Sequence, residues 1–309
     1  MSMIFTRALV LASLFMTLSL PVNAENTLPA PASGALCDES CLRGFVDDYL
    51  TSLVAQDVSR LPLSTDFVYT ENTVRLNPGL GLWTTVTGLG EFRIYMEDIY
   101  SSVAGFYGVV MENDRPVLMA VRLLVKNGEI KEIEAITTRQ EVTGSAPLPA
   151  DMPTRLARPI WNEVLTKAER VSRTEMIYAA NQYFEGMEMN TGNVIPFDDA
   201  CNRTENGVQT TNNPDLILPG AGDGGSQDMS CKGQFNSGGV NIFSTPERRF
   251  WMVDEQRGIV IGVFMFNIKG QPFVIPIAEA FKIKHGRIYE IEAAMVMEIG
   301  LPTGAMTGW

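Results

Sequence analysis

The sequence predicts an α+β fold of two tandem domains, each with N-terminal helices packed on a curved antiparallel sheet. The first observation is a repeat, because the tripeptide Thr-Glu-Asn at 70–72 recurs at 204–206 with an offset of 134. The second is that segment 127–134 matches segment 285–292 with an offset of 158. A collinear match over about a hundred residues, whose offset only grows, indicates two copies of one domain with insertions in the second.

The N-terminus has the pattern of a signal peptide over residues 1–24. Arg7 supplies the positive charge, 8–20 is apolar, and small residues precede a cleavage site after Ala24. The apolar run is short for a membrane span, although a retained N-terminal anchor is the alternative. A Pro-, Ala- and Ser-rich leader follows at 25–36. We therefore expect an exported protein, periplasmic or extracellular, that is not inserted in a membrane once the signal is removed.

The first copy, 37–143, begins with an amphipathic helix at 38–56, whose apolar residues recur at helical spacing. After it come segments of strand pattern, and the later ones are joined by the hairpin turns 112–114 and 126–128. The predicted strands are 67–76, 92–98, 106–112, 117–126 and 129–139.

A Pro-rich linker at 144–159 leads into the second copy, 160–309. This copy again begins with a helix, predicted at 160–187, and it carries a polar, Gly-rich insertion at 214–231 that the first copy lacks. Its remaining predicted strands are 206–211, 249–254, 258–268, 273–284 and 287–297.

Four cysteines in an exported chain indicate two disulfides. Three pairings can be drawn, and we favour Cys37 with Cys41 and Cys201 with Cys231, because each copy then closes its own bridge. A zinc site is not expected, since the chain has one His and the cysteine spacings are not those of a zinc module.

The composition argues against two classes of partner. The chain has 24 basic and 36 acidic residues, a formal net charge of −12, whereas nucleic acid and anionic lipid both require a basic surface. We expect a small-molecule ligand or substrate, no nucleic acid, and a homo-oligomer or an internal pseudo-dimer of the two copies. The segment 220–225 fits GxGxxG but lacks a surrounding βαβ unit, so we expect neither a nucleotide cofactor nor any other.

The order of elements resembles that of the nuclear transport factor 2-like superfamily, which includes the SnoaL-like proteins. The residues that carry the resemblance are 45–49 (FVDDY), 70–72 (TEN) and 128–134 (GEIKEIE). The second copy is similar to an uncharacterised exported family, through the segments 204–207, 210–214, 253–255 and 278–282. The resemblance implies cone-shaped domains with an internal pocket. It also implies either cofactor-free isomerase, dehydratase or cyclase chemistry or a pure binding or scaffold role, because fold does not decide function.

Candidate catalytic residues are acids placed on otherwise apolar strands, because burial raises a carboxyl pKa toward neutrality. Glu279 interrupts an apolar strand where the first copy has Val121, and Glu292 is the inner acid of the last strand. With Glu205 they form the predicted catalytic set of the second pocket. The predicted substrate-binding residues are Tyr183, Arg249, Asn206 and Trp251. The second copy is generally richer in polar residues, among them Asp198, Asp199, Arg203, Thr210, Asn212 and Gln234.

The corresponding candidates in the first pocket are Glu71, Glu134, Tyr49 and Arg93. Each has a plain structural alternative. A Glu–Arg pair common to both copies, with Arg93 or Arg249 as the partner, can simply hold the sheet, and a helix tyrosine can simply pack in the core.

The resulting hypothesis is an exported, cofactor-free lyase, isomerase or hydratase without a metal. It would act on a small, partly apolar organic molecule in the second cone by carboxylate acid–base chemistry. The alternatives are a non-catalytic small-molecule-binding protein and a structural pair of domains whose pockets are filled by their own side chains.

Overall fold

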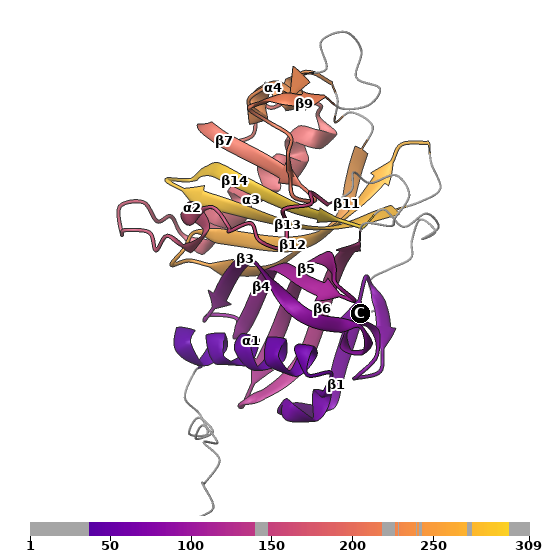
Figure 1. Cartoon of the computed structure of the whole chain (residues 1–309). Helices are drawn as coiled ribbons and strands as arrows, with labels where there is room; N and C mark the ends of the chain where they lie inside the picture. The colour runs from indigo at the N-terminus through magenta and orange to yellow at the C-terminus, as the bar shows by residue number, and fades with distance from the viewer. Residues whose placement is uncertain are drawn as a thin grey trace, which may run out of the picture. The chain divides into compact units, whose positions relative to one another are not determined.

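The computed structural model contains two six-stranded sheets (Figure 1). The residues that it describes are 37–139, 148–217, 226–227, 229–238, 240, 243–270 and 274–296. The predicted signal peptide, leader and GxGxxG segment lie outside these ranges, as does most of the C-terminal tail.

The first sheet has the strand order β2-β1-β6-β5-β4-β3 and is preceded in the chain by α1. Figure 1 shows α1 alongside this sheet. Asp38 starts the helix by accepting from the backbone N–H of Cys41, and a stripe that includes Leu42, Val46 and Tyr49 buries its inner face. The elements are α1 Glu39–Val54, the 3₁₀ turns η1 Val58–Arg60 and η2 Gly81–Thr84, β1 Leu63–Glu71, β2 Val74–Leu76, β3 Val86–Asp98, β4 Val103–Glu112, β5 Arg115–Lys126 and β6 Glu129–Arg139.

The second sheet has the equivalent order, β8-β7-β14-β13-β12-β11. Its helix α3 is fixed by a capping box, in which Ser172 and Glu175 each bond to the other's backbone. The elements are α2 Pro159–Asn162, α3 Arg173–Glu188, β7 Phe197–Glu205, β8 Val208–Gln209, β9 Asn213–Ile217, β10 Ser226–Gln227, α4 Cys231–Asn236, β11 Phe243–Asp254, β12 Ile259–Ile268, β13 Val274–Lys284 and β14 Arg287–Met295. β9 and β10 form a small separate sheet.

The repeated Thr-Glu-Asn tripeptide performs the same structural task twice. Asn72 and Asn206 both have φ of 47°, in the left-handed region that asparagine tolerates best among non-glycine residues. The amide oxygen of Asn72 accepts from Thr137 N at 2.8 Å, and that of Asn206 accepts from Met295 N at 2.8 Å. The amide nitrogens donate to the carbonyl oxygens of the same two residues. Each asparagine therefore ties the end of its strand to the last strand of its sheet.

Four sequence predictions about the elements are wrong. The strand predicted at 67–76 is two strands, β1 and β2, separated by a turn at 72–73. The segment predicted as a strand at 206–211 is a turn followed by the two-residue β8, and the long strand of this region, β7, precedes it. Both sheets are mixed, because β1 runs parallel to β6 and β7 runs parallel to β14. Hairpin turns set only the directions of sequential strands, and these closing pairs are not sequential. The helix predicted at 160–187 is broken into α2 and α3, because 163–172 adopts turns that end at the Ser172 cap.

Three apolar clusters occupy the interior. One lies between α1 and the first sheet, and a second lies between α3 and the second sheet. The third combines residues of both sheets with Leu148, Met152 and Trp161, so the predicted linker is partly buried. All described residues belong to one compact unit, Pro31–Trp309.

Reciprocal polar contacts join the two sheets. Asp98 accepts from Val253 N at 2.9 Å, and the equivalent Asp254 accepts from Glu97 N at 3.2 Å.

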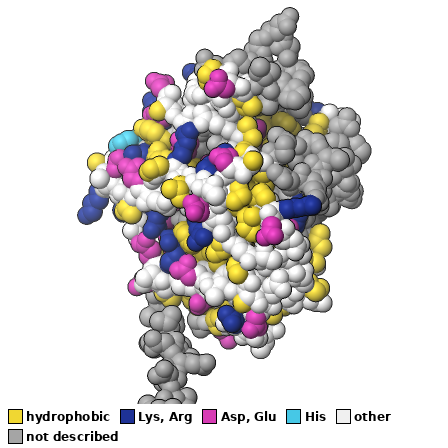
Figure 2. Space-filling view, in the orientation of Figure 1, with side chains coloured by type: hydrophobic (Ala, Val, Ile, Leu, Met, Phe, Trp, Pro, Cys, Tyr) yellow, Lys and Arg dark blue, Asp and Glu magenta, His cyan; other side chains and the backbone are white. Residues whose placement is uncertain are grey.

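On the face shown in Figure 2, acidic and basic side chains are interspersed. No helix of the described ranges is long and apolar enough to cross a membrane.

Candidate functional site

The two leading acids lie on opposite faces of the second sheet. Side chains alternate along a strand. Ile277 and Phe281 of β13 face α3, so Glu279 between them also faces α3. Ala294 of β14 belongs to the cluster between the sheets, and Glu292 shares its face. The two predicted catalytic acids therefore do not share a site, although Ala280 pairs with Glu292 in adjacent strands.

The Glu279 cluster consists of Tyr183, Arg203, Glu205, Gln234 and Glu279. The Tyr183 hydroxyl accepts from Arg203 Nε at 2.6 Å, and Tyr183 interacts with the Glu279 carboxyl, whose pKa it lowers. Arg203 forms an ion pair with Glu205 and donates to Gln234 Oε1 at 3.4 Å. A guanidinium thus lies between two carboxyl groups, and a phenol links it to one of them.

Burial gives the Glu279 carboxyl unusual acid–base properties. The side chain is 1% exposed, and this desolvation raises its pKa from 4.5 to about 7, against the opposing influence of Arg203 and Tyr183. Its Oε2 is buried without a hydrogen-bond partner in the described part of the chain. Burial also raises the pKa of Tyr183 well above its ordinary value. The cluster can therefore hold or release a proton near neutral pH.

Comparison with the first copy identifies what is specific to this cluster. By strand register, Arg203 occupies the place of Tyr69, and Glu279 occupies the place of Val121. On the equivalent apolar face, the second copy therefore has a carboxyl group and a guanidinium group where the first copy has Val121 and Tyr69. The repeat offset of 134 aligns Arg203 with Tyr69, and this difference between the copies could have singled out Arg203 in the sequence. The sequence analysis named it only as one polar residue among several.

Helix α4, which begins at the last residue of the insertion, packs against this cluster. The Phe235 ring of α4 lies against Tyr183 with a centroid distance of 4.9 Å and against Phe197 at 5.5 Å. The disulfide Cys201–Cys231 attaches α4 to β7, as predicted, and the predicted Cys37–Cys41 disulfide is also present.

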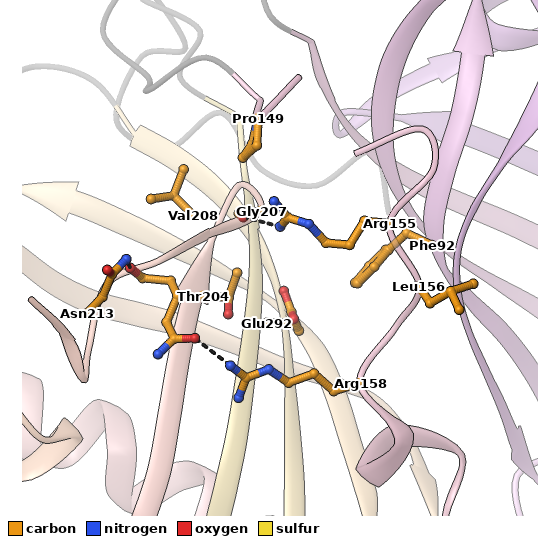
Figure 3. A pocket seen from close by; sticks show the side chains of 11 residues that line it. Phe92, Pro149, Arg155, Leu156, Arg158, Thr204, Gly207, Val208, Asn213 and Glu292 are labelled. Carbon is orange, nitrogen blue, oxygen red and sulfur yellow. Dashed lines mark hydrogen bonds between the residues drawn. The ribbon is translucent and has the colours of Figure 1, made fainter. Parts of the chain in front are cut away.

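A second group of polar residues lines a pocket on the opposite face, shown in Figure 3. This Glu292 pocket has a volume of about 370 Å³. The linker contributes four residues and β3 contributes one, while the rest come from the second copy. The lining residues are Phe92, Pro149, Arg155, Leu156, Arg158, Thr204, Gly207, Val208, Gln209, Asn213 and Glu292.

Two linker arginines border the Glu292 pocket. Arg155 donates to the Gly207 carbonyl at 2.5 Å and to both oxygens of Asp151. Arg158 donates to Glu290 Oε1 at 2.7 Å and to a side-chain oxygen of Gln209. Figure 3 shows both guanidinium groups beside Glu292.

Glu292 is 5% exposed, and desolvation raises its pKa from 4.5 to about 8. The neighbouring Glu290 raises this pKa further, whereas Arg158 and Arg155 oppose the rise. Among the described residues, the Glu292 side chain makes no hydrogen bond, so its carboxyl group is available to a ligand in the pocket.

The other predicted substrate-binding residues of the second copy lie elsewhere. Arg249 forms a two-pronged ion pair with Glu134 of the first copy, at 2.8 and 2.9 Å. The amide group of Asn206 forms hydrogen bonds with the backbone of Met295, and Trp251 is buried between the sheets. Only Tyr183 of the four reaches the Glu279 cluster. The sequence could not reveal the partner of Arg249, because the two residues are 115 positions apart.

The first copy has no equivalent of the Glu279 cluster. Glu71 accepts from the Tyr69 hydroxyl at 2.8 Å and forms an ion pair with Arg139, not with Arg93. Arg93 donates to a backbone carbonyl, Gly90 O, at 2.6 Å. Tyr49 is fully buried and packs edge-on against Trp83.

Glu134, the remaining first-pocket candidate, faces the second sheet. Its carboxyl group is fully buried and forms ion pairs with Arg122 and Arg249.

Within the described ranges, no group of three or more His, Cys, Asp or Glu side chains is placed to hold a metal ion.

Comparisons with known proteins give limited information. A family model described as a domain of unknown function (DUF8021) matches residues 169–295. No curated protein matches the chain. Among the solved structures that match is an LEH-like epoxide hydrolase of M. tuberculosis, with 11% identity and a TM-score of 0.24, covering 40% of this chain and 84% of that one. A likeness this remote carries no information about chemistry, which must come from the residues themselves.

Proposed function

We propose that the protein is an exported, cofactor-free lyase, isomerase or hydratase whose active site is the Glu279 cluster. The observation that carries the proposal is a buried carboxyl with an unpartnered oxygen and a pKa of about 7. A general acid or base is most effective when its pKa lies near the working pH. Most buried polar side-chain atoms have a hydrogen-bond partner, so an unpartnered oxygen on a buried carboxyl marks a candidate functional group.

The chain in this proposal is a tandem of two nuclear transport factor 2-like domains, 37–143 and 160–309, each a cone of helix and curved sheet. Two observations support it: the two sheets have equivalent strand orders, and α1 and α3 are separated by the same offset of 134 as the Thr-Glu-Asn repeat. The two disulfides support export, since such bonds persist in oxidising compartments. The first domain then serves as a packing partner.

Each member of the cluster has a distinct role. Glu279 exchanges a proton with the substrate through its free oxygen. Tyr183 and Arg203 hold that carboxyl in place and stabilise negative charge that develops on a substrate oxygen. Glu205 orients Arg203 through their ion pair and balances its charge.

The surrounding residues indicate the substrate class. The rings of Phe184, Phe235 and Phe281 enclose Tyr183 at centroid distances between 4.9 and 5.1 Å. A small, partly apolar molecule with one polar oxygen suits such a site. Because the Phe235 ring covers Tyr183, the substrate must displace α4 to reach Glu279.

The test does not require the substrate to be known in advance. The mature protein is incubated in D₂O with a panel of small carbonyl compounds, alcohols and alkenes, and mass spectrometry detects deuterium uptake or a gain or loss of water. We expect turnover by the wild type that Glu279→Gln abolishes. Glu292→Gln, on the opposite face of the sheet, should retain it. Turnover that survives in Glu279→Gln would exclude this carboxyl as the catalytic group, and capture of a compound without any change would favour a binding protein.

A further inference from the structure

The Glu292 pocket is separate from the Glu279 cluster, because the paired strands β13 and β14 lie between them. Its volume of about 370 Å³ is within the usual range for a small organic ligand. The pocket also lies partly against the linker, which the Glu279 cluster does not contact. A ligand at this place would therefore be recognised by a different set of residues.

The pocket has more hydrogen-bond donors than acceptors. Two guanidinium groups carry ten N–H donors between them. Arg155 uses three of these on Asp151 and a backbone carbonyl, and Arg158 uses two on Glu290 and a side-chain amide. Five N–H groups are left without a protein acceptor among the described residues. The ligand that complements this surplus is rich in acceptor oxygens.

Glu292 and Thr204 strengthen this preference. A carboxyl that keeps its proton is a hydrogen-bond donor, and burial keeps Glu292 protonated at neutral pH. The Thr204 hydroxyl, which also lines the pocket, makes no hydrogen bond within the described ranges.

The remaining wall of the pocket is apolar. Phe92, Pro149 and Val208 line it, and Leu156 is 71% exposed beside them. A single exposed aliphatic side chain is ordinary, whereas one that belongs to a larger apolar patch can mark a binding site. Leu156 is of the second kind, because it extends the apolar wall of the pocket. A ligand can therefore place an apolar body against this side while its polar end meets the arginines.

We propose that the Glu292 pocket binds a small organic monocarboxylate. Its carboxylate oxygens accept from Arg155, from Arg158 and from the protonated Glu292, and its apolar body lies against Phe92 and Leu156. Guanidinium forks bind carboxylates in preference to most other groups, because two parallel N–H donors match the two oxygens. The arrangement is a binding site and requires no chemical step.

Binding should depend on pH through Glu292. The groups that act on this carboxyl are Glu290 on its own strand, Arg155 and Arg158 from the linker, and Tyr107 from β4. When Glu292 loses its proton, the pocket gains a negative charge and loses a donor, so a carboxylate ligand is repelled. With a pKa of about 8, one tenth of the sites remain protonated at pH 9, and the apparent Kd should rise about tenfold between pH 6 and pH 9.

The experiment measures the binding of benzoate to the mature protein by calorimetry and by ligand-observed NMR at pH 6 and pH 9. Benzamide, which has the same shape without the charge, is the ligand control. We expect saturable benzoate binding that is tighter than benzamide binding and about tenfold weaker at the higher pH. Glu292→Gln should remove the pH dependence while keeping the binding, because its amide still donates.

Two arginine variants complete the test. Arg158→Gln should weaken benzoate at both pH values, whereas Arg60→Gln, on the exposed turn η1, removes the same charge away from the pocket and should leave the Kd unchanged. Circular dichroism verifies that each variant is folded. The proposal is overturned if benzoate fails to saturate at millimolar concentration, binds no better than benzamide, or keeps its pH dependence in Glu292→Gln. None of these outcomes bears on turnover at Glu279.

Discussion

The most direct physical consequence of the Glu279 cluster is a pH-dependent cost to stability. The pKa of Glu279 is about 7 in the folded chain and close to 4.5 when the chain unfolds. Below pH 4.5 both states hold the proton and there is no cost. Between pH 4.5 and 7 the unfolded state releases the proton while the folded state keeps it, so stability falls as pH rises. Above pH 7 the full cost remains, and at 1.36 kcal/mol for each pKa unit it is about 3 kcal/mol.

The substitution Glu279→Gln removes this titration while preserving the size of the side chain. We expect the stability of the variant relative to the wild type to increase by about 2.5 kcal/mol from pH 5 to pH 8.5. Urea unfolding followed by circular dichroism at the two pH values measures it. Glu255→Gln, an exposed acid in the turn between β11 and β12, is the control and should leave the pH profile unchanged. Parallel profiles for the wild type and Glu279→Gln would refute the reasoning, because the carboxyl would then titrate alike in both states.

Two further predictions concern the scaffold. Asn206→Ala removes two hydrogen bonds to Met295 and forces alanine into a φ of 47°, so we expect a loss of about 2–3 kcal/mol in the free energy of unfolding. Asn206→Gly, which tolerates that φ, should recover part of it, and an equal loss in both variants would contradict a backbone role. Replacing Cys201 and Cys231 by serine opens a loop with a separation of 30 residues and should cost about 3–4 kcal/mol in the same unfolding assay. A loss no greater than that caused by opening the Cys37–Cys41 loop, with its separation of 4, would contradict the loop-length argument.

Sequence reasoning located the elements more successfully than their partners. The helix predicted at 38–56 corresponds to α1, and both predicted hairpin turns contain residues with positive φ, Asn113 and Asn127 among them. Such features depend on local spacing and turn chemistry, which the sequence states directly. The parallel pairing of β1 with β6 was missed, because no turn connects those strands.

The same distinction holds for the candidate site. Glu279 was identified correctly as a buried acid, because it interrupts an apolar strand and replaces Val121. Glu292 was also buried as expected, but strand parity places it on the other face, and the sequence did not show which face meets the helix. Arg249 was assigned to the second pocket as an arginine available to Glu205, whereas its carboxylate partner, Glu134, comes from the first copy. Residue spacing along the sequence cannot predict contacts between segments that lie far apart in the chain.

The charged residues that make up the Glu279 cluster explain why it can hold a proton. A buried arginine alone in place of Tyr69 would be costly, and Glu205 already supplies the opposite charge at the position equivalent to Glu71. Glu279, on β13, lies two strands away from β7 and brings a second carboxyl to the same guanidinium. Two ionised carboxylates would leave an unbalanced negative charge in an apolar interior, so the pair is most stable when one carboxyl remains protonated. In the first copy Val121 takes the place of Glu279, and the half-buried Arg139 pairs with both Glu71 and Glu112. The difference between the copies is therefore not the number of carboxyl groups at one guanidinium but the burial of Glu279, which raises its pKa to about 7.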